Sequence, residues 1–178
     1  MPESIAQSLA MLRGGLFGAR WIEPEYYHIT LRFIGDIDAG VARDALFELS
    51  RVRKPAVSLI VDGLSIFGND RPRAIVALIR PNLALAELQA DHERTMRKVG
   101  LAPDTRKFTP HVTLAWLRRV KPASVAEYMS VRGYFPSREF AVDHFTVFSS
   151  RESTGGGPYV VEATYSLIAR QVVANTTR

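Results

Sequence analysis

The chain has 178 residues, 47% of them apolar, so it is long enough to bury one hydrophobic core. It contains no cysteine, which excludes disulfides, thiolate catalysis and cysteine-based zinc sites and leaves histidine, carboxylate and hydroxyl groups for chemistry. Lysine and arginine together number 23 against 18 acidic residues, and arginine dominates. The excess of basic side chains has two explanations. Either the protein binds a polyanionic partner, or it has the diffuse basic surface that is common in an arginine-rich proteome.

The sequence shows no membrane segment and no export signal. No apolar run approaches the length of a membrane span, and Met1 to Arg13 shows helical spacing instead of a charged stretch followed by an apolar block. We therefore expect a cytoplasmic protein with no membrane partner. We also expect it to act as a monomer, without an obligate protein partner.

The first half of the chain predicts a helix, a strand, a second helix and two further strands. Apolar residues recur at helical spacing in both helices, and Asp38 is a favoured N-terminal cap for the second. Alternating apolar and polar residues mark the strands. The predicted ranges are Glu3–Leu12, Trp21–Ile34, Asp38–Leu49, Val57–Phe67 and Arg73–Arg80.

The second half repeats this order. A helix, a strand, a helix and two strands follow one another again, with glycine and proline at the breaks. A glycine-rich turn precedes the last strand. The predicted ranges are Pro81–Val99, Pro110–Leu117, Pro122–Val131, Glu139–Ser150, the turn Gly155–Pro158 and Tyr159–Ala169.

The repeat predicts an α+β fold with two pseudo-symmetric lobes of largely antiparallel β-sheet and outer helices around a central cleft. We expect a single domain over residues 1–178, with an internal duplication into lobes at about 1–80 and 81–178. A strand equivalent to Arg73–Arg80 is expected before Pro2. Either a longer reading frame or a shorter sheet in the first lobe accounts for its absence.

Each half carries one His-x-Thr-x motif, with His28 and Thr30 in the first and His111 and Thr113 in the second. Because side chains alternate along a strand, each histidine and its threonine face the same side. If the two strands meet, two imidazoles and two hydroxyls surround one point. One such motif alone is more often a polar surface pair, but two at matching positions of a repeat favour a site.

This set of groups suits a phosphodiester. A neutral imidazole accepts a proton from the attacking oxygen, an imidazolium gives one to the leaving oxygen, and hydroxyls bind the non-bridging oxygens. The rival interpretation is a zinc or iron site. It has little support, because each motif offers one histidine and no carboxylate. We therefore predict no metal and no cofactor.

Several segments resemble the 2H phosphoesterase superfamily, and within it the bacterial and archaeal RNA 2′,3′-cyclic phosphodiesterases, also called 2′-5′ RNA ligases. The resemblance spans nearly the whole chain and is specific, because both His-x-Thr-x motifs occur in their expected contexts. The matching segments are Trp21–Glu25, HITLRFIG at 28–35, GLSIFGNDRPRAIVAL at 63–78, KFTPHVTLAWL at 107–117 and FTVFSSRESTGGGPYVV at 145–161.

The resemblance implies hydrolysis of an RNA 2′,3′-cyclic phosphate to a 2′-phosphomonoester, with 2′-5′ ligation as the reverse reaction. His28 and His111 would be the acid/base pair, without an assignment of which is which, and Thr30 and Thr113 the phosphate ligands. Because side chains alternate along a strand, Arg32 faces the same side as His28 and Thr30 and is a further candidate for a phosphate contact. The alternative is that Arg32 is an ordinary exposed arginine.

One position departs from the family pattern. Trp116 stands where these phosphodiesterases usually have an arginine, and it either stacks on a base or simply packs. Phe67 and Tyr159 are further candidates for base or RNA contacts. Two alternatives stay open: a related enzyme for a small cyclic nucleotide or an ADP-ribose cyclic phosphate, and a non-catalytic RNA-binding module.

Overall fold

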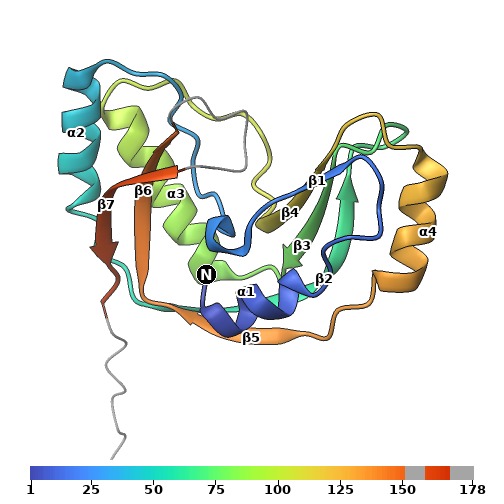
Figure 1. Cartoon of the computed structure of the whole chain (residues 1–178). Coiled ribbons are helices and arrows are strands. Elements are labelled where there is room, and N and C mark those ends of the chain that lie inside the picture. The colour runs from blue at the N-terminus through green and yellow to red at the C-terminus, as the bar shows by residue number, and fades with distance from the viewer. Residues whose placement is uncertain (151–158, 169–178) are drawn as a thin grey trace, which may run out of the picture.

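The computed structural model describes residues 1–150 and 159–168. Four α-helices, one 3-10 helix and seven strands make up this part of the chain (Figure 1). In chain order they are α1 (Glu3–Ala10), β1 (Ala19–Trp21), the 3-10 helix Pro24–Tyr26, α2 (Ala39–Leu49), β2 (Val57–Phe67), β3 (Ala74–Ile79), α3 (Leu83–Lys98), β4 (His111–Leu117), α4 (Pro122–Arg132), β5 (Arg138–Val142), β6 (His144–Ser150) and β7 (Tyr159–Ser166).

The strands form two antiparallel sheets. One has five strands in the order β1-β4-β3-β2-β5, and the other pairs β6 with β7. A bridge between Pro55 and Ile168 ties the end of the second sheet to the start of β2. The sheets thus meet through backbone hydrogen bonds as well as side-chain packing, and the α+β antiparallel fold predicted from the sequence is confirmed.

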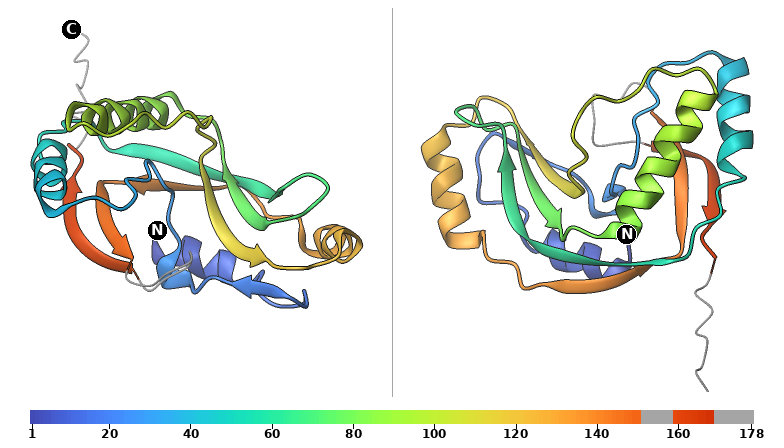
Figure 2. Two further views of the ribbon diagram at one scale, coloured as in Figure 1. Left: turned by 90° about the horizontal axis from the view of Figure 1, so that it is seen from above. Right: turned by 180° about the vertical axis from the view of Figure 1, so that it is seen from behind.

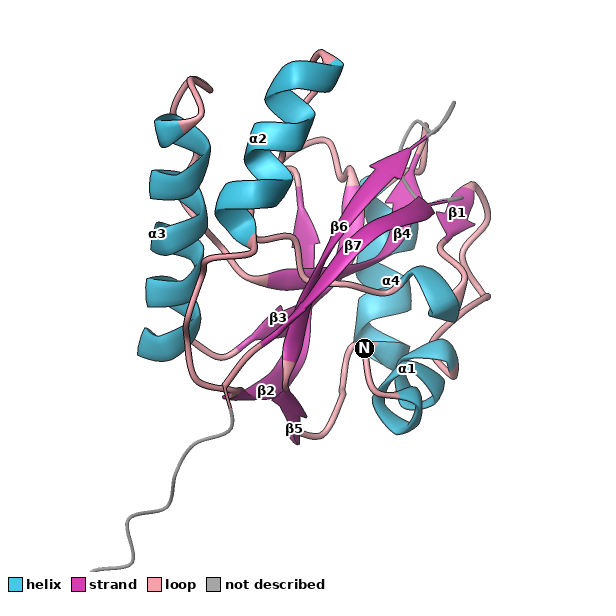
Figure 3. Ribbon diagram, turned by 90° about the vertical axis from the view of Figure 1, so that its left-hand side faces the viewer, coloured by secondary structure: helices cyan, strands magenta, loops and turns pink. Residues whose placement is uncertain are grey.

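The elements form two arms joined along one side by β2 and β5 (Figures 1 and 2). Helices α2 and α3 lie with β6 and β7 in one arm, which Figure 3 shows from its outer side, and α4 lies beside the tip of the β2–β3 hairpin in the other. The five-stranded sheet takes β1, β2 and β3 from the first predicted half and β4 and β5 from the second. Strands of both predicted halves therefore lie in one sheet, and the duplication into two lobes stays a prediction.

One hydrophobic core links the helices to the sheets. The central strand β3, between β2 and β4, is buried on both faces, with Ile75, Val76 and Ala77 fully covered. Leu9 of α1 and Leu88 of α3 contribute buried side chains to the same core. This rigid centre holds β4, and therefore the second motif, in place.

Most predicted elements are confirmed within a few residues. Asp38 caps α2 as expected, because its carboxylate accepts hydrogen bonds from the backbone N–H groups of Gly40 and Val41 at 2.8 and 3.0 Å. The predicted turn at Gly155–Pro158 and the last residue of the predicted strand Tyr159–Ala169 lie outside the described residues. No helix in the described part of the chain is both long and apolar enough to cross a membrane.

Two strand predictions were wrong. The predicted strand Trp21–Ile34 is a short β1, the 3-10 helix and an extended segment with a single bridge, because Pro24 has no N–H for a ladder and fits the first turn of a helix. The predicted strand Glu139–Ser150 is two strands. It breaks at Asp143, where β5 leaves the side of β2 and β6 begins its pairing with β7.

Candidate active site

The two His-x-Thr-x motifs meet at one backbone bridge. Ile29 pairs antiparallel with Val112, so His28 lies opposite Thr113 and Thr30 lies opposite His111. Side chains alternate across the ladder, so these four point away from the Ile29 and Val112 face. The structure therefore gathers the four predicted residues into one cluster, the motif quartet, defined by His28, Thr30, His111 and Thr113.

Both histidines are oriented in the same way. Nδ1 of His28 lies 2.7 Å from the carbonyl oxygen of Tyr26, and Nδ1 of His111 lies 2.6 Å from that of Thr109. A carbonyl only accepts, so Nδ1 carries the proton in each ring. In the neutral ring the lone pair is then on Nε2, the nitrogen left for a substrate. Each motif thus presents an imidazole ready to accept a proton at Nε2 or, once protonated, to donate one.

Burial gives His28 a distinct electrostatic setting. Desolvation lowers the pKa of His28, which the carbonyl of Tyr26 partly offsets. The charges of the chain's N-terminal ammonium and of His111 lower the pKa of His28 further. The neutral form of His28 is therefore favoured at neutral pH in the free protein.

Aromatic rings pack against both histidines, in each case from the other half of the chain. Phe67, from the β2–β3 hairpin, meets the His111 ring edge-on at a centroid distance of 4.5 Å. Tyr159 and Phe148, from the β6–β7 hairpin, lie 5.3 and 6.2 Å from the His28 ring. Each histidine thus packs against a hairpin from the other half of the chain. A base contact by Phe67 or Tyr159 stays a prediction.

Arg32 lies beside the quartet but is held by protein groups. Its Nε is 2.6 Å from a carboxylate oxygen of Glu93 on α3, and the two side chains are only 10% and 19% exposed. Its guanidinium also donates to the carbonyl of Ala102 at 2.5 Å and to that of Phe33. Glu93 in turn accepts from the backbone N–H of Asp104. These contacts fasten the first motif to α3 and to the loop that leads into β4, and the predicted phosphate contact of Arg32 would compete with them.

Three comparisons with known proteins bear on this geometry. The family described as LigT like Phosphoesterase matches residues 1–76 and 79–159, which is most of the chain. The chain belongs to this family. A Thermotoga maritima protein named RNA 2′,3′-cyclic phosphodiesterase is 30% identical over 156 residues, covering 85% of this chain and 80% of that relative.

Two further known proteins are similar to the chain. A protein of the same name from Aeropyrum pernix is 33% identical over 99 residues, 54% of this chain, and the match spans 56% of that relative, a little over half its length. The solved structure of E. coli LigT complexed with 3′-AMP has the same fold, with a TM-score of 0.74 at 22% identity and coverage of 94% of this chain and 93% of that one.

A β-bulge places Trp116, the position that the sequence marked as a departure from the family pattern, on the same side of β4 as His111 and Thr113. Ile75 pairs with Ala115 but Val76 pairs with Thr113, so Leu114 is an extra residue in β4. Leu114 and Ala115 are both fully buried, and alternation resumes with Trp116 on the Thr113 side. The indole Nε1 of Trp116 is buried without a hydrogen-bond partner in the described structure. Stacking of Trp116 on a base stays a prediction.

Sequence reasoning missed two parts of the site. The carbonyls of Tyr26 and Thr109 fix the histidine tautomers, but nothing in a single sequence marks a backbone acceptor. Phe148 lies against His28, and its only signal was its position in a family-like segment. Among the described residues, no three His, Cys, Asp or Glu side chains gather into a group that could hold a metal ion.

Proposed function

We propose that this LigT-like phosphoesterase hydrolyses a 2′,3′-cyclic phosphate at the end of RNA to a 2′-phosphomonoester. The observation that carries the proposal is the motif quartet, in which both imidazoles present Nε2 and both threonines flank the same point. The curated relatives named RNA 2′,3′-cyclic phosphodiesterase support the same reaction.

In the proposed mechanism, a water oxygen attacks phosphorus while Nε2 of one neutral imidazole takes its proton. The bond from phosphorus to the 3′-oxygen breaks, and Nε2–H of the other imidazole protonates that oxygen. Hydroxyls of Thr30 and Thr113 donate to the non-bridging oxygens as negative charge grows there. The near symmetry of the two histidines permits either assignment of acid and base. Attack on the cyclic phosphate by an RNA 5′-hydroxyl in place of water, again with the 3′-oxygen leaving, would join RNA ends through a 2′-5′ linkage.

The proposal includes metal-independent catalysis without a cofactor, by a monomer in the cytoplasm. Activity should survive a chelator, since the mechanism uses imidazoles and hydroxyls alone. Loss of activity with a chelator, and recovery with a divalent ion, would replace the acid/base mechanism with a metal-assisted one.

The test is turnover of a cyclic-ended oligoribonucleotide and of a 2′,3′-cyclic mononucleotide, with the position of the product phosphate determined. His28→Ala and His111→Ala should each reduce kcat by about 10²–10⁴-fold, as expected when a general acid or base is removed. His144→Ala is the matched control, because this exposed histidine pairs with its neighbour Asp143. Unchanged turnover in either motif variant contradicts the catalytic role of that histidine. No turnover by the unaltered protein would leave RNA binding alone as the function.

Trp116 in place of the family's arginine favours one second candidate, a 2H enzyme for a small cyclic nucleotide or an ADP-ribose cyclic phosphate. The same assay separates the two, since a higher kcat/KM for the small substrate than for the oligomer identifies the second. Trp116→Arg, which restores the family's usual residue, should then shift that preference toward RNA.

A further inference from the structure

Four arginines gather at the far end of the five-stranded sheet, outside the motif quartet. Arg71 and Arg73 lie in the β2–β3 turn, and Arg118 and Arg119 directly follow β4. The backbone N–H of Leu117 donates to the carbonyl oxygen of Arg73 at 2.8 Å, which brings the two segments together. We name this group, Arg71, Arg73, Arg118 and Arg119, the basic rim.

The basic rim carries charge that the rest of the described structure does not neutralise. All four side chains are exposed, and none has a carboxylate within ion-pair distance among the described residues. Arg80, at the other end of β3, is by contrast paired with Asp62. Unpaired guanidinium groups, each a fork matched to phosphate oxygens, form a surface suited to a polyanion.

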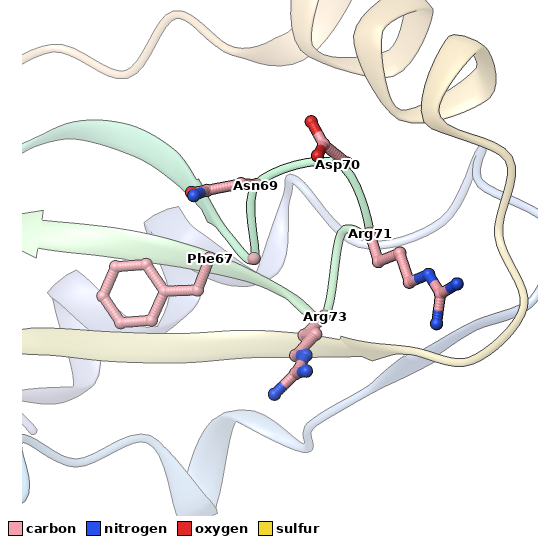
Figure 4. A pocket seen from close by; sticks show the side chains of 6 residues that line it. Phe67, Asn69, Asp70, Arg71 and Arg73 are labelled. Carbon is pink, nitrogen blue, oxygen red and sulfur yellow. The ribbon is translucent and has the colours of Figure 1, made fainter.

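A hollow lies at the β2–β3 turn of the basic rim. It has a volume of about 610 Å³ and is lined by Phe67 and by the turn that follows it, including Asp70, Arg71 and Arg73 (Figure 4). Figure 4 shows both guanidinium groups extending away from the turn on the side opposite the Asp70 carboxylate. Phe67 also contacts the His111 ring, so one residue that lines the hollow packs against a residue of the motif quartet.

The turn that presents these arginines has a fixed backbone. Gly68 has a φ of 93°, and a Cβ there would collide with the carbonyl oxygen of Arg71, so the turn requires glycine. The N–H of Arg73 closes the turn by donating to the carbonyl oxygen of Phe67 at 2.7 Å. Arg119 has a left-handed φ of 59°, rare for a residue other than glycine and frequent at ligand-binding segments.

We propose that the basic rim binds the phosphodiester backbone of the RNA on the 5′ side of the cyclic end. β4 rises about 3.3 Å per residue, so its course from His111 to Leu117 covers roughly 20 Å, further than one nucleotide extends. A mononucleotide in the quartet therefore leaves the rim empty, whereas an oligonucleotide fills it. This inference rests on the proposed function and makes an oligoribonucleotide the preferred substrate class.

The test compares a cyclic-ended hexaribonucleotide with a 2′,3′-cyclic mononucleotide. In the Arg71→Gln/Arg73→Gln double variant we expect kcat/KM for the hexamer to fall about tenfold, with the mononucleotide changed less than about twofold. The salt dependence of hexamer binding should also weaken, by about 0.7 in logarithmic slope for each phosphate that the variant no longer binds. The control, Arg43→Gln/Arg97→Gln, removes the same charge from exposed positions on α2 and α3 in the other arm and should leave both substrates unchanged.

Equal losses on both substrates, or equal losses in the control variant, would overturn the basic rim as an RNA site. Fluorescence anisotropy of a labelled hexaribonucleotide separates this inference from the proposed function. If the protein cleaves neither cyclic substrate but loses hexamer affinity in the rim variant alone, the rim stands and the proposed reaction fails. If it cleaves both equally well before and after the rim substitutions, the reaction stands and the rim fails.

Discussion

The two His-x-Thr-x motifs share a sequence pattern but are held by different forces. The second lies in β4, which is hydrogen-bonded to β1 on one side and β3 on the other. The first lies in an extended segment with one backbone bridge, at Ile29, and is held by the contacts of Arg32 with Glu93 and Ala102. The quartet thus joins a motif fixed by a sheet to one fixed by an ion pair.

The largest expected effect comes from breaking that ion pair. Arg32→Gln leaves Glu93 as an uncompensated, mostly buried charge and should lower the free energy of unfolding by about 3 kcal/mol, measured by denaturant titration. Arg80→Gln is the control. Its pair with Asp62 links β2 to the end of β3 but is 49% and 41% exposed, so its loss should lower the free energy of unfolding far less than the loss of the Arg32 pair.

Glu93→Gln distinguishes the two roles of Arg32. If Arg32 positions the first motif, Glu93→Gln should reproduce part of the loss in stability and in kcat. If instead Arg32→Gln raises KM at unchanged stability while Glu93→Gln has no effect, Arg32 is the phosphate ligand that the sequence predicted.

A somewhat smaller effect is expected when either motif threonine loses its hydroxyl. The two substitutions test whether both motifs contribute equally to the chemistry. Thr30→Val and Thr113→Val keep the side-chain shape but remove the hydroxyl. Each should lower kcat by about 10²-fold if the hydroxyl stabilises the charge on phosphate oxygen, with KM little changed. Thr146→Val, on β6 away from the quartet, is the matched control. A decrease confined to one motif would show that the quartet is chemically asymmetric.

The smallest effect concerns pH. Because burial lowers the pKa of His28, the acidic limb of the kcat/KM profile should lie below pH 6.5, the ordinary histidine value. As the pH falls through this lowered pKa, His28 becomes protonated, no neutral partner for His111 remains, and the rate falls. Phe148→Ala opens the ring to water and should move the limb upward toward 6.5. Phe47→Ala, exposed on α2, should leave it in place, and an unmoved limb in the Phe148 variant would contradict the desolvation argument.

The sequence alone predicted the elements whose local pattern agrees with the final structure. β2 alternates from Val57 to Val61 and β4 from His111 to Leu114, and Asp38 stands where a helix cap is needed, so their positions followed from local rules. The prediction that the motifs of His28 and His111 meet likewise followed from the repeat. These features required no knowledge of which strands are neighbours.

The remaining features depend on contacts between distant segments. Within the described residues, the first motif has one ladder partner, Val112, which lies in the other half of the chain, so the motif forms no regular strand. Arg32 alternates with His28 in sequence, yet Glu93 binds its guanidinium from a helix that no strand pattern relates to it. The bulge at Leu114 arises from the register of β4 against β3, which a single-sequence pattern does not encode.

That bulge has a consequence for position 116. Leu114 and Ala115 together fill the core side of β4, so Trp116 lies on the side of β4 that carries His111 and Thr113, partly buried at the edge of the core. A substitution of Trp116 therefore alters the side of the strand on which the second motif stands, while the two fully buried residues before it stay in the core.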